Sequence, residues 1–309
     1  MAYLAGMLDA EGCVGIAKDR YKKTPHHKLQ VSVSNTDLSL LEGLKSEFGG
    51  FICSVKRYKK HHRLGYQWYI TSGPAGGLLA AVKPYTVAKV DQIDVAIDFV
   101  EGKIRLPNLS AANHPEMLRR EALYQAMMAL NRKGGDDGKR FVKPTRGKLT
   151  HQPLLGAYLA GVVDGDGCIF IRRGQVTRKN GQVFVNHTIN VTVVNTSAKI
   201  IQWLLDNVGG SASSAAFARP EWKSRHAWSI YGAAAVQMLG LIRPFLRMKE
   251  QQSSLGLELF GRRTKLTRGS PKHLVAAETA RREELYAKMR ALNQRGSAAA
   301  TTKSTALAA

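Results

Sequence analysis

Two nine-residue segments of the chain are near copies of each other. LAGMLDAEG occupies residues 4–12 and LAGVVDGDG occupies residues 159–167, and each ends in an acidic residue before a glycine, Glu11 and Asp166. Small residues at every fourth position lie on one face of a helix, where two backbones can approach closely. Here they are Ala2, Gly6 and Ala10 in the first copy and Ala157, Gly161 and Gly165 in the second. We expect two packed helices whose ends bring the two acids together.

The duplication extends over most of the 309 residues. Beyond the motifs the halves align at a constant offset, which pairs Asn35 with Asn195, Trp68 with Trp228 and Lys89 with Lys249. The offset between the two motifs is smaller, so the second half must have extra residues between its motif and its second strand, at a hairpin. An internal repeat of this length indicates two copies of one structural unit.

The repeat also predicts the domain organisation. RREALYQAMMALNRKG at residues 119–134 matches RREELYAKMRALNQRG at residues 281–296, so each unit carries an appended helix. We predict an N-terminal repeat over residues 1–133 and a C-terminal repeat over residues 153–295. The Gly- and Pro-containing stretch at residues 134–152 is interpreted as a linker, and residues 296–309 have the composition of a disordered tail.

Hydrophobic periodicity predicts the same element order, α-β-β-α-β-β-α, in each repeat. In the first repeat the predicted strands lie near residues 14–20, 28–34, 51–58 and 66–72, and the helices after the motif lie near 35–48, 76–82 and 90–100. The appended helices are predicted at residues 115–133 and 281–294. The fold class is therefore α+β, with two pseudo-symmetric repeats that each contain an antiparallel sheet and that meet at the two motif helices.

The charge of the chain indicates its partner. Lys and Arg number 46 against 23 Asp and Glu, a formal net charge of +23 that is spread over both halves, as expected for a polyanion-binding surface. No apolar run is long enough to span a membrane. The three cysteines have no metal-type spacing and the first motif starts at Leu4, so we expect an intracellular, reducing location and no secretion.

With the paired motif, the repeats and the charge in view, the sequence resembles the LAGLIDADG homing endonucleases in their single-chain, two-repeat form. The resemblance implies that the motif helices form the interface between the repeats, and that Glu11 and Asp166 bind the divalent metal ions used for DNA cleavage, assisted by the main-chain carbonyls of Ala10 and Gly165. It implies Mg²⁺ as the cofactor, with Mn²⁺ able to substitute and Ca²⁺ expected to bind without supporting cleavage.

The chemistry independently requires such acids. Hydrolysis of a phosphodiester needs an activated water and stabilisation of the leaving oxygen, which oxygen-ligated Mg²⁺ supplies. Two acids match two scissile phosphates, one in each strand. For Asp9 and Asp164, which lie earlier in each motif, we expect only a structural role.

Two further residue pairs match family positions that surround the metals. Lys89 and Lys249 would stabilise developing negative charge or perturb a solvent molecule, the alternative being lysines on a solvated helix face. Asn35 and Asn195 would orient water, the alternative being that each asparagine helps to start the helix that follows it.

DNA recognition would rest on the polar faces of the strands, lying in the major groove. A register error of one residue moves a side chain to the other face. By alternation the outward candidates are Lys18, Arg20, Lys28, Gln30, Ser32, Lys56, Tyr58, Gln67 and Tyr69 in the first repeat, and Arg172, Arg178, Asn190, Thr192, Arg219, Lys223 and Arg225 in the second. Loop residues 59–63 are expected to touch phosphate.

These features predict a monomeric, metal-dependent, site-specific endonuclease of double-stranded DNA. It would cut one phosphodiester in each strand across the minor groove of a long asymmetric target and leave 3′ overhangs, in a bacterial cytoplasm or an organelle, wherever the host genome lies. The alternative is a non-cleaving nucleic-acid-binding protein or a maturase of the same fold that binds intron RNA. Retention of both Glu11 and Asp166 with both lysines favours cleavage.

Overall fold

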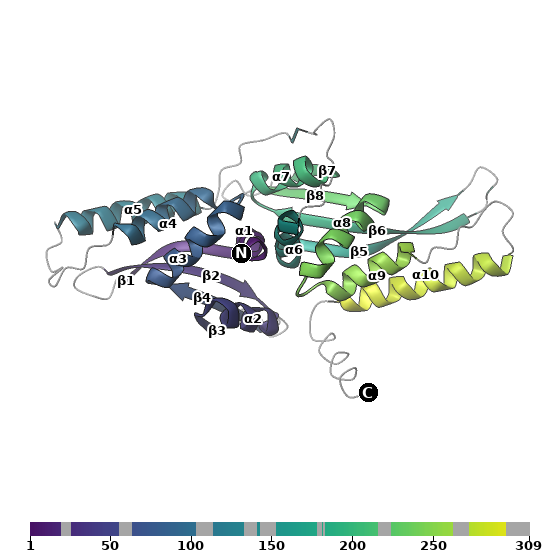
Figure 1. The fold of residues 1–309 in the computed structure, drawn as a ribbon. Coiled ribbons are helices and arrows are strands. Elements are labelled where there is room, and N and C mark those ends of the chain that lie inside the picture. The colour runs from purple at the N-terminus through teal and green to yellow at the C-terminus, as the bar shows by residue number, and fades with distance from the viewer. Residues whose placement is uncertain are drawn as a thin grey trace.

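Two similar units flank a central pair of helices in the structure (Figure 1). The computed structural model describes residues 1–19, 26–55, 64–102, 114–132, 141–142, 153–177, 181, 183–215, 224–261 and 272–294. Each unit contains one four-stranded antiparallel sheet, with strand orders β1-β2-β4-β3 and β5-β6-β8-β7. The predicted α+β class and the two-repeat architecture are therefore confirmed.

The N-terminal repeat begins with the first motif helix and follows the predicted element order. Its elements are α1 (Ala2–Glu11), β1 (Gly12–Asp19), β2 (His26–Asn35), α2 (Leu38–Phe48), β3 (Phe51–Val55), β4 (Gly65–Thr71), α3 (Ser72–Val82), the 3-10 turn η1 (Lys83–Tyr85), α4 (Val90–Glu101) and the appended helix α5 (Pro115–Asn131).

The C-terminal repeat has the same order of elements. They are α6 (Pro153–Asp166), β5 (Gly167–Thr177), β6 (Val183–Asn195), α7 (Ala198–Val208), β7 (Ser211–Ala215), β8 (Arg225–Tyr231), α8 (Gly232–Ile242), η2 (Arg243–Phe245), α9 (Glu250–Gly261) and α10 (Lys272–Leu292). The appended helix α10 begins at Lys272, nine residues before the start at Arg281 that the match predicted (281 − 272).

The helix–strand turn after α2 depends on glycines that both repeats share. Asp37 caps α2 by accepting hydrogen bonds from the main-chain N–H groups of Ser39 and Leu40, and the helix stops at Gly49 with φ at 74°. A Cβ atom on Gly50 would come within 2.5 Å of the Tyr69 carbonyl oxygen. The Gly-Gly pair is therefore required both by backbone conformation and by the close approach of β4.

The two hairpins that follow the motif helices differ in length. Strand β1 ends at Asp19, whereas β5 continues to Thr177, and β6 likewise begins earlier than β2 relative to the aligned positions. Figure 1 shows the β5–β6 hairpin extending away from the centre of the molecule. The extra residues of the second repeat thus lengthen both strands of its first hairpin, in the interval that the sequence offset indicated.

The repeats meet along α1 and α6 in close backbone contact. A Cβ atom on Gly6 would lie 2.1 Å from the Tyr158 carbonyl oxygen, and one on Gly161 would lie 2.1 Å from the Tyr3 carbonyl oxygen. A Cβ on Gly165 would lie 2.6 Å from the Ala10 Cβ. The predicted packing of small residues is therefore confirmed, and it brings Glu11 and Asp166, the last residues of the two helices, to the same end of the pair.

The appended helices cover the first hairpins on the faces that carry the core. Asn131 at the end of α5 donates a hydrogen bond of 2.8 Å to the Val14 carbonyl in β1, and Asn293 donates one of 2.8 Å to the Ile169 carbonyl in β5. Val14 and Ile169 are both buried. No helix of the described residues is long and apolar enough to cross a membrane.

Candidate active site

Asp9 and Asp164 are buried structural acids, as predicted. The Asp9 carboxylate accepts hydrogen bonds of 2.7 to 3.1 Å from the main-chain N–H groups of residues 87–89, which precede α4. Asp164 accepts bonds of 2.7 to 3.2 Å from those of residues 247–249, which precede α9. Both side chains are 1% exposed. Each acid therefore caps the entrance to a helix of its own repeat.

Each of these acids also accepts a hydrogen bond from the other repeat. The Tyr158 hydroxyl donates to Asp9 and the Tyr3 hydroxyl donates to Asp164, both at 2.9 Å. Burial and the neighbouring carboxylate raise the pKa of each tyrosine far above its usual value. The phenols therefore stay protonated and act as donors that tie the two motif helices together.

The two predicted lysines lie against the motif helices and not on a solvated helix face. The Lys89 Nζ donates to the Asp9 carbonyl at 2.8 Å, and the Lys249 Nζ donates to the carbonyls of Val163 and Asp164 at 2.8 and 2.6 Å. Burial lowers the pKa of both ammonium groups, and nearby acids, including Glu11 and Asp166, oppose that shift. Two desolvated cations therefore lie beside the paired acids.

The carboxyl groups of Glu11 and Asp166 both have raised pKa values. Burial raises the pKa of the Asp166 carboxyl to about 6, and the negative charge of Glu11 adds to the rise, while Asn195 and the two lysines oppose it. Burial also raises the pKa of Glu11, against the opposing charges of Lys249 and Lys89. Paired carboxylates with perturbed pKa values are typical of functional sites.

Both asparagines help to start a helix, one of the two roles considered for them, and their role in orienting water stays a prediction. The Asn35 Oδ1 accepts from the Asp37 N–H at 2.9 Å and the Asn195 Oδ1 accepts from the Ser197 N–H at 2.6 Å, so both help to start a helix. Their amide nitrogens differ: that of Asn195 donates to the Asp166 carboxylate at 2.5 Å, whereas that of Asn35 lies 3.6 Å from the Met248 Sδ. Among the residues that the structure describes, a side-chain amide holds Asp166 and none holds Glu11.

The donor set fits a hard divalent cation. In the described part of the chain, no group of three or more His, Cys, Asp and Glu side chains could hold a metal ion. Within these described ranges, Glu11 and Asp166 would be the side-chain ligands, with the carbonyls of Ala10 and Gly165, water and phosphate oxygens completing the shell. Mg²⁺ prefers such oxygen ligands and commonly binds through one or two carboxylates together with substrate phosphates.

Five predicted recognition residues lie on the exposed face of the N-terminal sheet. Cross-strand pairing places Gln30 opposite Thr71, Ser32 opposite Tyr69, and Lys28 opposite Ala17, all on one face. Gln67 lies on the same face and donates through its Nε2 to the Ser32 Oγ at 3.3 Å. Ser32 is only 4% exposed, so it orients Gln67 instead of facing solvent itself.

Lys18 lies on the opposite face, and the prediction that it points outward with Lys28 was wrong. It pairs across the strands with the buried His27, and its Nζ bonds to Glu121 of α5 at 2.8 Å. Since side chains alternate along a strand, positions 18 and 28 cannot share a face in this register. Lys18 therefore helps to dock the appended helix.

The described candidates of the C-terminal sheet all share its exposed face. Thr188 pairs with Arg172, Asn190 pairs with Tyr231, and Thr192 pairs with Ser229, on one side of the sheet. Arg225 lies at the outer end of the same face, opposite Ala215. The remaining candidates, Arg20, Lys56, Tyr58, Arg178, Arg219, Lys223 and residues 59–63, lie outside the described residues.

Comparison with known proteins supports the likeness that the sequence indicated. The LAGLIDADG endonuclease family model matches residues 4–79, which include the first motif and the N-terminal sheet. The chain as a whole has the two-repeat LAGLIDADG fold. A comparison with curated protein sequences gives no match.

Solved structures of LAGLIDADG proteins match along almost the whole chain. I-SmaMI bound to an uncleaved DNA target in the presence of calcium ions is 16% identical, with a TM-score of 0.58 and coverage of 94% of this chain and 96% of that one. I-LtrWI bound to target DNA is 14% identical, with a TM-score of 0.60 and coverage of 93% and 96%. At these identities the likeness shows that the chain shares the fold of these proteins, and nothing beyond the fold.

Sequence reasoning missed several polar residues of the second LAGLIDADG repeat. Asn186 and Thr188 lie on the exposed face of β6, and Tyr231 at the end of β8 is 67% exposed. The alternation of β6 could have identified the first two, had the strand been extended to its observed start at Val183. Tyr231 was harder to assign from alternation, because it is the last residue of β8 and the helix α8 begins directly after it.

Proposed function

We propose that the protein is a metal-dependent, site-specific endonuclease of double-stranded DNA. The observation that carries the proposal is the pair of acids Glu11 and Asp166, one from each repeat, at one end of the motif helices and between two exposed polar sheet faces. Two acids in one chain match two scissile phosphates, so a monomer suffices. The net charge of +23 supports a polyanionic substrate.

The residues around the acids have separable roles in this proposal. Glu11 and Asp166, with the carbonyls of Ala10 and Gly165, would hold Mg²⁺, which when bound activates water and offsets charge on the leaving oxygen. The hydrogen bond from Asn195 orients one oxygen of Asp166. Lys89 and Lys249 supply fixed positive charge beside the acids, where negative charge develops on the phosphate.

The position of the sheets suggests how the duplex is bound. Each acid directly precedes the first strand of its own sheet, Glu11 before β1 and Asp166 before β5. Each sheet would therefore lie in the major groove of one half-site while the acids approach the minor groove between them. Cutting one strand on each side of that minor groove leaves 3′ overhangs. Because the two faces carry different side chains, the target is expected to be asymmetric.

The first experiment selects and then cuts a target. Duplexes from a randomised library are selected for binding in Ca²⁺, and the enriched sequence is incubated with Mg²⁺, with Mn²⁺ and with Ca²⁺ alone. We expect both strands of one long sequence to be cut with Mg²⁺ or Mn²⁺, with 3′ overhangs on mapping of the ends, and no cutting with Ca²⁺.

Variants separate the chemistry from the binding. Glu11→Gln/Asp166→Asn should retain binding and lose cleavage, because neutral amides are poor ligands for a divalent cation. Glu47→Gln is the matched control, since Glu47 also lies at the interface between repeats, where it pairs with Arg247 at 2.6 Å, but is not among the paired acids. Cleavage by the double variant at the rate of the unmutated chain would overturn the proposed site. Selective binding without cleavage under every metal would leave only a binding or splicing role.

A further inference from the structure

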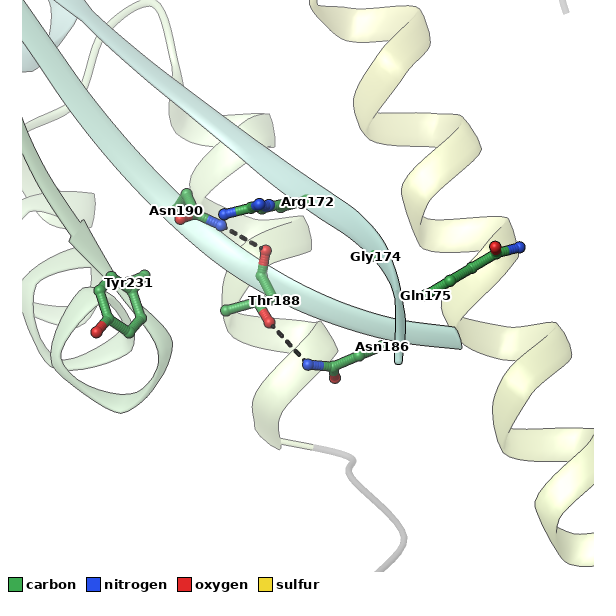
Figure 2. Close-up of a pocket in the computed structure, with 7 residues that line it drawn as sticks. All are labelled: Arg172, Gly174, Gln175, Asn186, Thr188, Asn190 and Tyr231. Atoms are coloured by element: carbon green, nitrogen blue, oxygen red, sulfur yellow. Dashed lines mark hydrogen bonds between the residues drawn. The ribbon is translucent and has the colours of Figure 1, made fainter. Parts of the chain in front are cut away.

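An open pocket of about 340 Å³ lies on the exposed face of the C-terminal sheet (Figure 2). Its walls come from the hairpin β5–β6 and the end of β8. The residues used below are Arg172, Gly174, Thr188, Asn190 and Tyr231. A Cβ atom on Gly174 would meet no atom within 4 Å, so the missing side chain leaves this part of the sheet open.

The amide of Asn190 has a defined orientation in this pocket. Its Nδ2 donates to the main-chain carbonyl of Thr188 at 2.9 Å, the dashed line between the two residues in Figure 2. A carbonyl oxygen can only accept, so the nitrogen must face Thr188 and the Oδ1 must face away from it. Asn190 therefore presents its Oδ1 to a ligand as an acceptor, while one of its two N–H donors is already used by Thr188.

Arg172 offers donors beside that acceptor. Figure 2 shows its side chain extending towards Asn190, and its guanidinium has no hydrogen-bond or ion-pair partner within the described residues. The next residue, Arg173, is on the other face and bonds to Glu283 of α10 at 2.8 Å. Adjacent arginines thus have opposite roles, one paired beneath the sheet and one exposed on it.

These two residues match the hydrogen-bonding edge of one base pair. In the major groove a G·C pair presents two acceptors on guanine, N7 and O6, followed by the N4–H donor of cytosine. Arg172 can donate to the first two, and the Asn190 Oδ1 can accept from the third. With an A·T pair in the same place, the N6–H donor of adenine would face the guanidinium, and the O4 acceptor of thymine would face the Asn190 oxygen. Both contacts are unfavourable.

We propose that Arg172 and Asn190 read a single G·C base pair in the half-site bound by the C-terminal repeat, in the pocket bounded by Thr188 and Tyr231. The proposal rests on the proposed function only for the identification of duplex DNA as the ligand. Since diagonal neighbours on a sheet face are about 7 to 8 Å apart, a long arginine side chain can reach the same base pair as Asn190.

The N-terminal sheet lacks this arrangement. At the aligned positions, Ala17 stands in place of Arg172 and Thr71 in place of Tyr231, with Gln30 in place of Asn190. Without the exposed guanidinium, the same base pair in the other half-site would not be required to be G·C. The two half-sites should therefore differ at these mirror-related positions.

Binding selection in Ca²⁺ tests the assignment without requiring cleavage. The unmutated chain should enrich G·C at one position of one half-site. Arg172→Ala should relax that position alone and weaken binding to the cognate duplex by roughly 5- to 150-fold, the range for loss of one bidentate base contact. Asn190→Asp keeps an acceptor and should retain the preference for cytosine, whereas Asn190→Ala should reduce it.

Arg173→Ala is the matched control, because it removes an adjacent arginine from the opposite face and should leave the base preferences unchanged. An Arg172→Ala profile identical to that of the unmutated chain, or relaxation in the half-site of the other repeat, would overturn the inference. A cut target with no G·C requirement would refute the inference and leave the endonuclease standing. A selected G·C position without cleavage would refute the endonuclease and leave the inference standing.

Discussion

The two repeats are most alike where their motif helices meet and least alike on their exposed sheet faces. At the interface Gly6 and Gly161 make equivalent contacts, and Asp9 and Asp164 accept equivalent hydrogen bonds. On the sheets, by contrast, Arg172 replaces Ala17 at matching positions. The interface constrains both halves by the same backbone geometry, whereas each sheet faces its own ligand surface.

The paired acids Glu11 and Asp166 occupy equivalent positions in the two repeats but differ in the side chains that contact them. Asp166 is held by Asn195, whereas the Asn35 amide nitrogen lies against Met248. The rings of Tyr3 and Tyr158 also differ, since Arg247 lies 4.5 Å from the first and Trp203 lies 4.6 Å from the second. Symmetry is thus strict for the backbone contacts and only approximate for the side chains around them.

Disrupting the close glycine contact between α1 and α6 should cause the largest loss of unfolding free energy. Gly161→Val places a side chain where a Cβ alone would be 2.1 Å from a backbone oxygen, so we expect a loss of unfolding free energy of about 4 kcal/mol or more. Urea denaturation measures it. Gly77→Ala is the control, because a Cβ there has no atom within 4 Å, and it should stabilise α3 by about 0.5 to 1 kcal/mol. Equal stability of the valine variant and the unmutated chain would contradict the close packing.

The buried acids should be equally important in both halves. Asp9→Asn and Asp164→Asn each turn an amide donor towards main-chain N–H groups, at an expected cost of about 3 kcal/mol in unfolding free energy. Tyr3→Phe removes only one hydrogen bond and should cost about 1 kcal/mol. Urea titrations of the three variants make the comparison. A large loss from one aspartate variant and none from the other would show that the two interface acids are not equivalent.

The asparagines should expose the asymmetry of the paired acids. Asn195→Ala removes a hydrogen bond to a carboxylate, so we expect about a tenfold slower cleavage of one strand. Asn35→Ala should have a much smaller effect, since the Asn35 amide does not hold an acid. Single-turnover cleavage of a duplex labelled on each strand gives both rates. Equal slowing by the two variants would mean that DNA binding rearranges Asn35 onto Glu11.

The smallest expected effect is a change with pH in how much bound Ca²⁺ raises the Tm. With a pKa of about 6, metal-free Asp166 takes up a proton in the folded state at higher pH than in the unfolded chain, so its stabilising contribution is present at low pH and lost as the pH rises through 6. A bound cation requires the ionised form. The rise in Tm caused by Ca²⁺ should therefore be larger at pH 7.5 than at pH 5.5, and Asp166→Asn should reduce that difference and leave only the part due to Glu11, whose pKa is also raised. A Ca²⁺ effect independent of pH in the unmutated chain would remove Asp166 from the metal ligands.

Much of the architecture could be predicted from the sequence because the same pattern occurs in both halves of the chain. The strand alternation around Val31 and the stop at Gly49-Gly50 recur around Val191 and Gly209-Gly210, and each copy supports the other. The start of α10 at Lys272 was missed, because the first half has no matching residues upstream of its own appended helix. The predicted domain boundaries and catalytic assignments stay predictions.

Lys18 shows where residue type misleads. It has the same parity along β1 as the buried Val14 and Ile16, so alternation alone places it on the core side of the sheet, as the pairing with His27 and the contact with Glu121 confirm. A basic residue beside a polar strand face is equally compatible with a ligand contact and with an ion pair beneath the sheet. Arg172 and Arg173 show both outcomes: Arg172 lines the pocket on the exposed face, and Arg173 pairs with Glu283 beneath the sheet.

By itself, the sequence determined the repeat, the helix interface and the identity of the paired acids, because these depend on small residues and carboxylates at fixed spacings along one helix. Only the tertiary structure decided the support around those acids and the residues of each recognition face. Asn195 at the end of β6 reaches Asp166 at the end of α6, and Arg172 and Asn190 line one pocket from the two strands of a hairpin. Such contacts depend on strand register and on the packing of distant segments, which no local spacing encodes.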